Sequence, residues 1–227
     1  MSSNSDTTRL NKYIAHHSGI SRREADTLIS SGRVRVDDTS TELGTQVAKN
    51  SIVTIDGKPL TQSHVYTYLA LHKPTGYVCS RKRQGDTPTI YELLPESLRK
   101  LKPVGRLDKD SSGILLLTDD GDFAHRMTHP SFYKTKVYHV TLDTPLEPLH
   151  QQMISDRGIS LDDGVSKFTI TSLTRPAYEI TMSEGRNRQI RRTFQALGYT
   201  VSKLHRVSFG AYELDLLTAG KYETIQA

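Results

Sequence analysis

The stretch Gly105-Arg106-Leu107-Asp108-Lys109-Asp110-Ser111-Ser112-Gly113, followed by the aliphatic run of residues 114–117, decides the fold of the larger part of the chain. Four consecutive aliphatic residues after a glycine are typical of a strand that is buried on both faces. The polar residues before them predict a tight turn that can aim a carboxylate from the start of that strand. From the spacing alone, both an ordinary Asx turn and a functional carboxylate fit this segment.

The same segment also matches part of a calcium-binding loop. Asp108, Asp110, Ser112 and Asp119 occupy positions one, three, five and twelve of an EF-hand loop. However, the twelfth position is an aspartate where a bidentate glutamate is usual, and Pro103 interrupts the helix that should enter the loop. We therefore predict no metal site here.

Strand patterns on both sides of this run often follow one another without a helix between them. We expect strands near residues 68–71, 77–79, 113–118, 136–142, 168–173, 177–182 and 200–208, and helices near 89–94, 122–128, 147–155 and 187–197. Strands that adjoin without a helical crossover indicate an antiparallel or mixed sheet. The sequence therefore predicts an α+β fold with a mixed, mainly antiparallel sheet and flanking helices.

The N-terminal third has a different pattern, in which two short helices precede short strands. Ser21 and Glu24 have the spacing of a capping box at the start of the second helix. Asp56-Gly57 marks a tight hairpin turn between strands. Arg22 and Arg23 occupy the first turn of the second helix, where positive charge opposes the helix dipole, so they favour contact with an outside partner.

Domain limits and location follow from composition. We expect a disordered tail over residues 1–8, a first domain over 9–62 and a second over 67–227. No stretch has the pattern of a signal peptide or of a membrane span, so we expect no membrane partner. The single cysteine, Cys79, cannot form an internal disulfide, which fits a reducing cytoplasm.

The net charge of +5 is concentrated in one segment. Residues 181–206 carry six arginines and lysines against Glu184 alone. Arg188, Arg191 and Arg192 recur at helical spacing, where each like-charged pair costs about 0.2–0.5 kcal/mol. A phosphate partner would remove this repulsion, so the pattern favours an RNA-binding surface or an active site.

With these segments identified, the chain resembles the branch of ribosomal RNA pseudouridine synthases that carry an N-terminal S4 RNA-binding domain. Residues 8 to about 62 resemble the S4 module. Residues 71–76, 105–118 and 184–194 resemble the family's first catalytic-domain motif, its aspartate motif and its basic motif. The resemblance spans nearly everything after residue 8.

The resemblance implies roles for individual residues. Asp108 corresponds to the catalytic aspartate, Tyr138 to the tyrosine that stacks on the target base, and Arg191 to the arginine paired with the aspartate. Without the resemblance, Tyr138 would be interpreted as a packing residue of a strand. The basic residues that we assign to RNA contact are Arg9, Lys12, Arg22, Arg23, Lys73, Arg106, Arg186, Arg188 and Arg192.

The resemblance also implies a reaction, the isomerisation of uridine to pseudouridine, which adds no atom and removes none, so that no cofactor is expected. The expected partner is ribosomal RNA or a ribosomal assembly intermediate, bound by a monomer. Residues 185–189 and 210–215 look closer to large-subunit members of the family, which favours a large-subunit target. The alternative is a non-catalytic RNA-binding or ribosome-assembly protein that retains the synthase fold.

Overall fold

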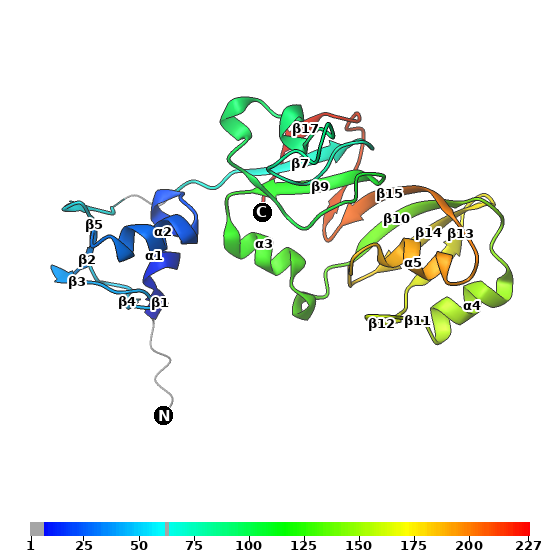
Figure 1. Cartoon of the computed structure of the whole chain (residues 1–227), viewed down its shortest axis with the longest axis horizontal. Coiled ribbons are helices and arrows are strands. Elements are labelled where there is room, and N and C mark those ends of the chain that lie inside the picture. The colour runs from blue at the N-terminus through cyan, green and yellow to red at the C-terminus, as the bar shows by residue number, and fades with distance from the viewer. Residues whose placement is uncertain (1–6, 62–63) are drawn as a thin grey trace. The chain divides into compact units, whose positions relative to one another are not determined.

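The computed structural model describes residues 7–61 and 64–227, which form two compact units that divide between Tyr66 and Thr67 (Figure 1). The predicted tail of residues 1–8 lies mostly outside the described residues. Thr7 and Thr8, its last two residues, belong to strand β1 (Thr7–Arg9), because they pair with β4 (Gln46–Ala48). The predicted first-domain limit at residue 62 also lies outside the described residues.

The smaller unit follows the predicted order of helices and strands. It contains α1 (Leu10–Ser18), α2 (Arg22–Ser30), β2 (Val34–Val36), β3 (Thr39–Ser40), β5 (Val53–Ile55) and β6 (Lys58–Pro59), with the last four strands in the sheet order β3-β2-β5-β6. Ser21 Oγ accepts the Glu24 N–H at 3.2 Å and Glu24 Oε2 accepts the Ser21 N–H at 2.6 Å, which confirms the capping box. Asp56 and Gly57 have φ of 51° and 74°, as a tight turn between β5 and β6 requires.

The larger unit is built on one mixed sheet. Within the described residues its strands run in the order β13-β14-β10-β15-β9-β7-β17, and β9 and β15 are its one parallel pair. The α+β prediction is therefore confirmed. The strands are β7 (Tyr68–Lys73), β9 (Ser112–Thr118), β10 (Lys136–Leu142), β13 (Thr169–Ser172), β14 (Ala177–Met182), β15 (Val201–Phe209) and β17 (Tyr222–Thr224), with β8 (Lys102–Pro103) beside β9 and β16 (Tyr212–Glu213) beside β15.

Strand β9 is buried on both faces, as its aliphatic run predicts. Leu115 and Leu117 belong to the core on one side of the sheet, while Ile114 and Leu116 belong to the core on the other. Burial of each side chain contributes about 1.5–3 kcal/mol. The strand also separates Asp119 from Asp108 by its whole length, so the twelve residues of the calcium-loop pattern do not wrap around a common centre.

Helices pack against each side of the sheet. α5 (Gln189–Gln195) packs on the core with Leu115, and α3 (Gly121–Thr128) packs on the core with Ile114. The remaining elements are α4 (Pro148–Asp156), the hairpin of β11 (Ile159–Leu161) and β12 (Gly164–Ser166), and the 3₁₀ turns η1 (Ile90–Leu93), η2 (Glu96–Leu98) and η3 (Pro130–Phe132).

Three details differ from the sequence-based expectation. The strand expected near residues 77–79 is only a single bridge between Val78 and Thr89, because Gly76 with φ of 90° turns the chain before it. The helix expected near residues 187–197 begins at Gln189, because Arg188 adopts the left-handed conformation with φ of 46°. The pairing of β17 with β7 and the β11–β12 hairpin were not predicted.

Candidate active site

A cavity of about 530 Å³ lies in the larger unit, where the turn before β9 meets β10, β15 and the start of α5. This volume is in the range of sites that bind small molecules. The residues of its lining that carry the argument below are Arg106, Asp108, Lys136, Tyr138, Arg188 and Arg206. Two of the three expected catalytic residues, Asp108 and Tyr138, are therefore brought together, although 30 residues separate them in the sequence.

Backbone contacts hold the turn that carries Asp108. The Asp108 carbonyl accepts the Ser111 N–H at 3.1 Å, and Lys73 Nζ donates to the Asp108 carbonyl at 2.9 Å and to the Ser111 carbonyl at 2.7 Å. The turn is thus closed by its backbone, and the Asp108 carboxylate is left facing the cavity. An Asx turn closed by the carboxylate does not form at this position.

Lys73 is buried within the protein, and not on its surface as we expected of an RNA contact. Its side chain is 0% exposed and lies beneath the Asp108 turn, and its third contact is the Pro74 carbonyl at 3.1 Å. Burial lowers the pKa of Lys73, while Cys79, Asp108 and Asp110 act in the opposite direction. The sequence shows only a lysine near the end of a strand, which we interpreted as an RNA contact. In the structure, Lys73 points into the protein and donates hydrogen bonds to three carbonyl groups.

Arginines of the basic segment surround the acidic turn. Arg188 Nη1 lies 3.7 Å from Asp108 Oδ2, and Arg188 also donates two hydrogen bonds to the Asp110 carboxylate at 3.1 and 3.2 Å. Burial raises the pKa of Asp110, but the hydrogen bond from Arg188 and the charges of Arg191 and Arg188 outweigh it, so the pKa is lowered. Both aspartates therefore face positive charge.

The structure corrects the expected partner of Asp108. Arg191 Nε lies 3.3 Å from Asp110 Oδ2, and its two terminal nitrogens donate to the Asp110 carbonyl at 2.9 Å and the Val201 carbonyl at 2.7 Å. Asp110, and not Asp108, is thus the ion-pair partner of Arg191, whereas Arg188 reaches both aspartates. The left-handed conformation of Arg188 explains this difference, because it takes that side chain off the helix that carries Arg191.

Tyr138 and Arg106 occupy the wall and the rim of the cavity. Tyr138 lies on β10, pairs in register with Arg206 of β15, and is 8% exposed. Arg106 is exposed on the turn two residues before Asp108. A buried aromatic ring beside a carboxylate can hold a planar base, and an exposed arginine at the rim can reach a nucleic acid.

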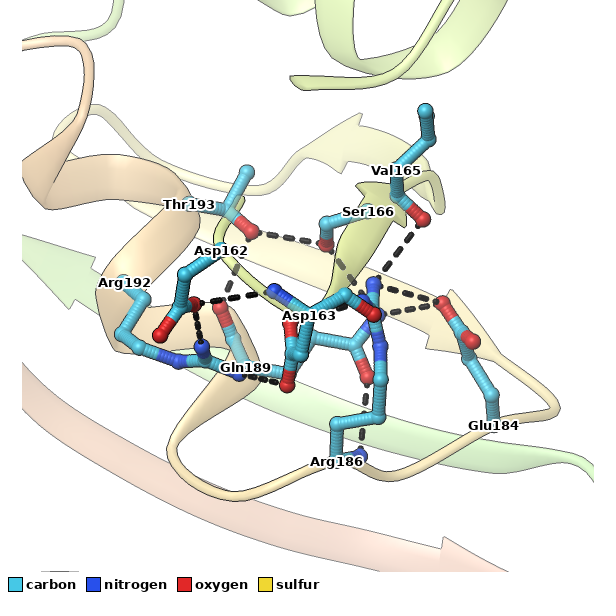
Figure 2. A network of polar contacts seen from close by, with 9 residues as sticks. All are labelled: Asp162, Asp163, Val165, Ser166, Glu184, Arg186, Gln189, Arg192 and Thr193. Atoms are coloured by element: carbon cyan, nitrogen blue, oxygen red, sulfur yellow. Dashed lines mark hydrogen bonds and ion pairs between the residues drawn. The ribbon is translucent and has the colours of Figure 1, made fainter. Parts of the chain in front are cut away.

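Arg186 and Arg192 are bound within the protein, which changes their expected role. Figure 2 shows their guanidinium groups directed at the loop that joins β11 to β12. Arg192 contacts Asp162 at 2.5 Å and Asp163 at 2.6 Å, and Arg186 contacts Asp163 at 2.8 Å and the Val165 carbonyl at 2.9 Å. These arginines hold the hairpin in place, so their terminal nitrogens bind protein groups in this structure, whereas the sequence suggested that they face RNA.

The expected RNA-binding residues of the smaller unit lie on its first elements. Arg9, Arg22 and Arg23 are exposed and Lys12 is half-buried. Arg22 Nη2 donates to Asn11 Oδ1 at 3.4 Å. The arrangement is compatible with a basic surface on α1 and α2.

Two cations of the cavity, Lys136 and Arg206, were missed as site residues. Lys136 stands two positions before Tyr138, so strand alternation put it on the same face, but no motif marked it. In the sequence, Arg206 appeared only as part of the basic segment. Its place in the cavity depends on the fold, which brings β15 next to the turn before β9. Gly113, with φ of 115°, permits this approach, since a Cβ there would overlap the backbone of Arg206.

Among the residues that the structure describes, none of the helices is long and apolar enough to cross a membrane. In the same residues, no group of three or more His, Cys, Asp or Glu side chains is arranged to hold a metal ion.

A mixed sheet that carries a base-sized cavity with a carboxylate, an aromatic ring and arginines defines the class of enzymes that act on nucleic acid bases. Comparison with known proteins identifies the family. The model of the RNA pseudouridylate synthase family matches residues 67–196, and the S4 domain model matches residues 8–53. The chain belongs to the RNA pseudouridylate synthase family, and it is a pseudouridine synthase with an N-terminal S4 domain.

Individual relatives match over most of their length. The ribosomal small subunit pseudouridine synthase A of Pasteurella multocida is 37% identical over 224 residues, which cover 96% of each chain. The ribosomal large subunit pseudouridine synthase B of Yersinia pestis is 36% identical over 219 residues. The match covers 91% of this chain and 68% of that protein. A solved pseudouridylate synthase is 34% identical, with a TM-score of 0.69 and 96% coverage of both chains. The resemblance inferred from the sequence is confirmed.

Proposed function

We propose that this enzyme isomerises a uridine of small-subunit ribosomal RNA to pseudouridine, with Asp108 as its catalytic carboxylate. One observation carries the proposal, namely the cavity that Asp108 and Tyr138 line together beside Arg188. The names of the relatives support ribosomal RNA as the substrate class. The S4 domain supports RNA binding outside the cavity.

The chemistry accounts for these residue types. The reaction breaks the bond between C1′ and N1 of uridine, turns the base and joins C1′ to C5, and a proton leaves C5 while N1 gains one. The base must first leave its stack, which costs a few kcal/mol and calls for an aromatic surface in the enzyme. Tyr138 supplies that surface in our proposal, and Arg106 enters the gap that the base leaves.

Asp108 acts as an anion in each route that a carboxylate can take. It attacks C1′, attacks the base or removes the C2′ proton, and each step requires an ionised oxygen. Arg188, 3.7 Å from Asp108 Oδ2, provides positive charge beside it. Arg191 acts through Asp110, so we assign it to positioning the turn rather than to contact with Asp108.

The relatives do not favour our expectation of a large-subunit target. That expectation rested on the short segments 185–189 and 210–215. The small-subunit relative matches over 96% of both chains, whereas the chain spans 68% of the large-subunit relative. We therefore assign the small subunit, since this chain matches the small-subunit relative over nearly all of its length, whereas about a third of the large-subunit relative has no counterpart in the match.

Mapping pseudouridine in ribosomal RNA tests this assignment. RNA from cells that lack the protein is compared with RNA from cells that express it, and with RNA from cells that express Asp108→Asn. We expect one pseudouridine of the small-subunit RNA to be absent in the first and third samples. A lost pseudouridine in large-subunit RNA would refute the subunit assignment, and an unchanged map of both RNAs would refute ribosomal RNA as the substrate.

A further inference from the structure

Arg206 is a buried cation without a carboxylate partner among residues 7–61 and 64–227. Its residue is 2% exposed, its Nε donates to the Ile114 carbonyl at 2.9 Å, and its Nη2 is buried without a hydrogen-bond partner among the described atoms. A guanidinium stays charged in proteins, so it cannot escape burial by losing its proton. An unpaired buried charge is strongly unfavourable, which favours a ligand that compensates it.

Lys136 is a second cation in the same cavity. Its Nζ lies 5.3 Å from the centre of the Phe209 ring, and the Arg206 guanidinium carbon lies 4.7 Å from the same centre. Nζ donates to the Ser183 carbonyl at 2.8 Å and to the Lys134 carbonyl at 3.2 Å, which leaves one of its three donors free to bind a ligand. Both cations are thus fixed around one aromatic ring.

The positive charges of Lys136 and Arg206 repel one another. The pKa of Lys136 is lowered to about 8 by burial first and by the charge of Arg206 second, while Glu184 acts in the opposite direction. Asp108 also lines the cavity, but its ion-pair partner among the described residues is Arg188. An anion that enters the cavity would therefore relieve repulsion between Lys136 and Arg206.

A phosphate group fits this pair best. Guanidinium groups bind phosphate oxygens in a planar fork, and a lysine adds a compact charge beside it. A nucleotide that leaves its stack brings its base and its backbone phosphates together, so a base beside Tyr138 places a phosphate within the same cavity. The cavity volume of about 530 Å³ is in the range of ligand sites.

We propose that Lys136 and Arg206 form a phosphate subsite inside the cavity, which binds a backbone phosphate next to the uridine that enters. This inference rests on the proposed function for the identity of the ligand as RNA. The existence of the subsite is testable without RNA, because inorganic phosphate carries the same chemistry.

The first experiment measures thermal unfolding of the full chain in inorganic phosphate and in chloride at equal ionic strength. Lys136→Met keeps a stem of similar length on the Phe209 ring but removes the charge, and Lys102→Met removes an exposed lysine of β8 as the matched control. We expect a saturable rise of Tm with phosphate in the wild type and in Lys102→Met, and little or none in Lys136→Met.

The same data can overturn the subsite. A wild type whose Tm does not respond to phosphate, or a Lys136→Met variant that responds as fully as the wild type, would each refute it. The result does not depend on enzymatic activity, so it is separate from the outcome of the pseudouridine mapping.

The second experiment identifies the phosphate. RNA substrates carry one neutral methylphosphonate beside the target uridine, on its 5′ or its 3′ side, or at a distant position as a control. At one of the two adjacent positions we expect the methylphosphonate to raise KM about tenfold for the wild type, which corresponds to a loss of about 1.4 kcal/mol of binding. For Lys136→Met and Arg206→Gln we expect the same substitution in the RNA to raise KM less than about twofold. Equal rises in wild type and Lys136→Met would refute an RNA phosphate at this pair, whereas an unmodified control RNA that is not converted would refute the proposed function alone.

Discussion

Asp108 and Asp110 stand two residues apart, yet their surroundings differ. Asp110 is held by Arg188 and Arg191, whereas the Asp108 carboxylate faces the cavity, and its ion-pair partner among the described residues is Arg188. One aspartate is thus a structural anchor for the arginines and the other is available for chemistry. The difference arises because the two carboxylates point in different directions, and single substitutions at each aspartate test it.

We predict that Asp108→Asn lowers the rate of isomerisation by about 10³-fold or more, because an amide is neither a nucleophile nor a base. Asp110→Asn is the matched control and should retain measurable activity, since it loses only an anchor. Rates from single-turnover assays and Kd from RNA titration measure the two effects, and we expect Kd for Asp108→Asn to stay within about twofold of wild type. Equal losses of rate in both variants would contradict the assignment.

We predict that Lys73→Met destabilises the protein by about 2 kcal/mol or more, because three carbonyl groups lose a hydrogen bond from Lys73. Among the residues that the structure describes, only the Asp108 carbonyl of these three keeps a second donor, the Ser111 N–H. The turn that carries Asp108 loses its support, so the rate of isomerisation should fall while RNA affinity is kept. Urea unfolding measures the stability, single-turnover assays measure the rate and RNA titration measures the affinity, with Lys102→Met as the surface control. A loss of RNA affinity without a loss of stability would restore Lys73 as an RNA contact.

His205 supplies a pH dependence of stability. Its Nδ1 lies 2.8 Å from Ser112 Oγ, and its pKa is lowered from 6.5 to about 4, first by burial and then by the charges of His72, Lys203 and His139. Between these pH values the unfolded chain binds the proton and the folded protein does not, so stability falls as pH falls through this window. The slope from one proton is at most about 1.4 kcal/mol per pH unit.

We predict that His205→Gln lacks this contribution. Urea unfolding of wild type and variant at pH 7 and at about pH 4.5 measures it, and carboxylates common to both proteins cancel in the difference. The wild type should lose more stability on acidification than the variant. Identical losses would show that His205 keeps an ordinary proton affinity in the folded protein.

At the scale of elements, the β11–β12 hairpin depends on α5 and on the segment before it. The loop of the hairpin bears Asp162 and Asp163, which bind Arg186 and Arg192 (Figure 2). Gln189 and Thr193 add hydrogen bonds to Ser166 at 3.1 and 2.7 Å. The charged residues that appear in the sequence as an RNA-binding face therefore join two elements of the protein.

We predict that Arg192→Gln exposes the hairpin to solvent exchange but leaves the salt dependence of RNA binding unchanged. Hydrogen exchange over residues 159–166 measures the first effect, and RNA titrations at several salt concentrations measure the second. Arg106→Gln is the comparison variant, because this exposed arginine at the cavity rim should reduce the salt dependence without altering exchange in the hairpin. A reduced salt slope for Arg192→Gln would mean that this arginine leaves the hairpin to bind RNA.

At the scale of the whole molecule, the chain has two units, and in our proposal the first adds RNA contacts to those of the second, which carries the chemistry. The S4 domain carries exposed arginines, and the cavity lies wholly within the larger unit. Each unit has its own buried core, in which Leu10 and Ile14 belong to the smaller one and Leu115 and Phe194 to the larger one. Separate cores imply that each unit folds by itself.

We predict that deletion of residues 1–66 weakens RNA affinity and reduces its salt dependence while the remainder stays folded. Each lost phosphate contact should reduce the slope of log K against log salt by about 0.7–0.9. Circular dichroism and urea unfolding report the fold of residues 67–227. An unchanged salt slope in the truncated protein would show that the S4 domain makes no phosphate contacts.

The sequence by itself determined the α+β class, the capping box at Ser21, the doubly buried strand β9 and the family to which the chain belongs. These features are local, because periodicity, caps and motifs depend on residues that are neighbours in the chain. The tertiary structure decided which cations reach the cavity. Lys73 points inward, Arg186 and Arg192 bind the hairpin, Arg191 binds Asp110, and Lys136 and Arg206 enter the cavity instead. Long basic side chains look alike in a sequence, and only the partners that folding brings within reach determine whether each one binds RNA, a carbonyl group or a carboxylate.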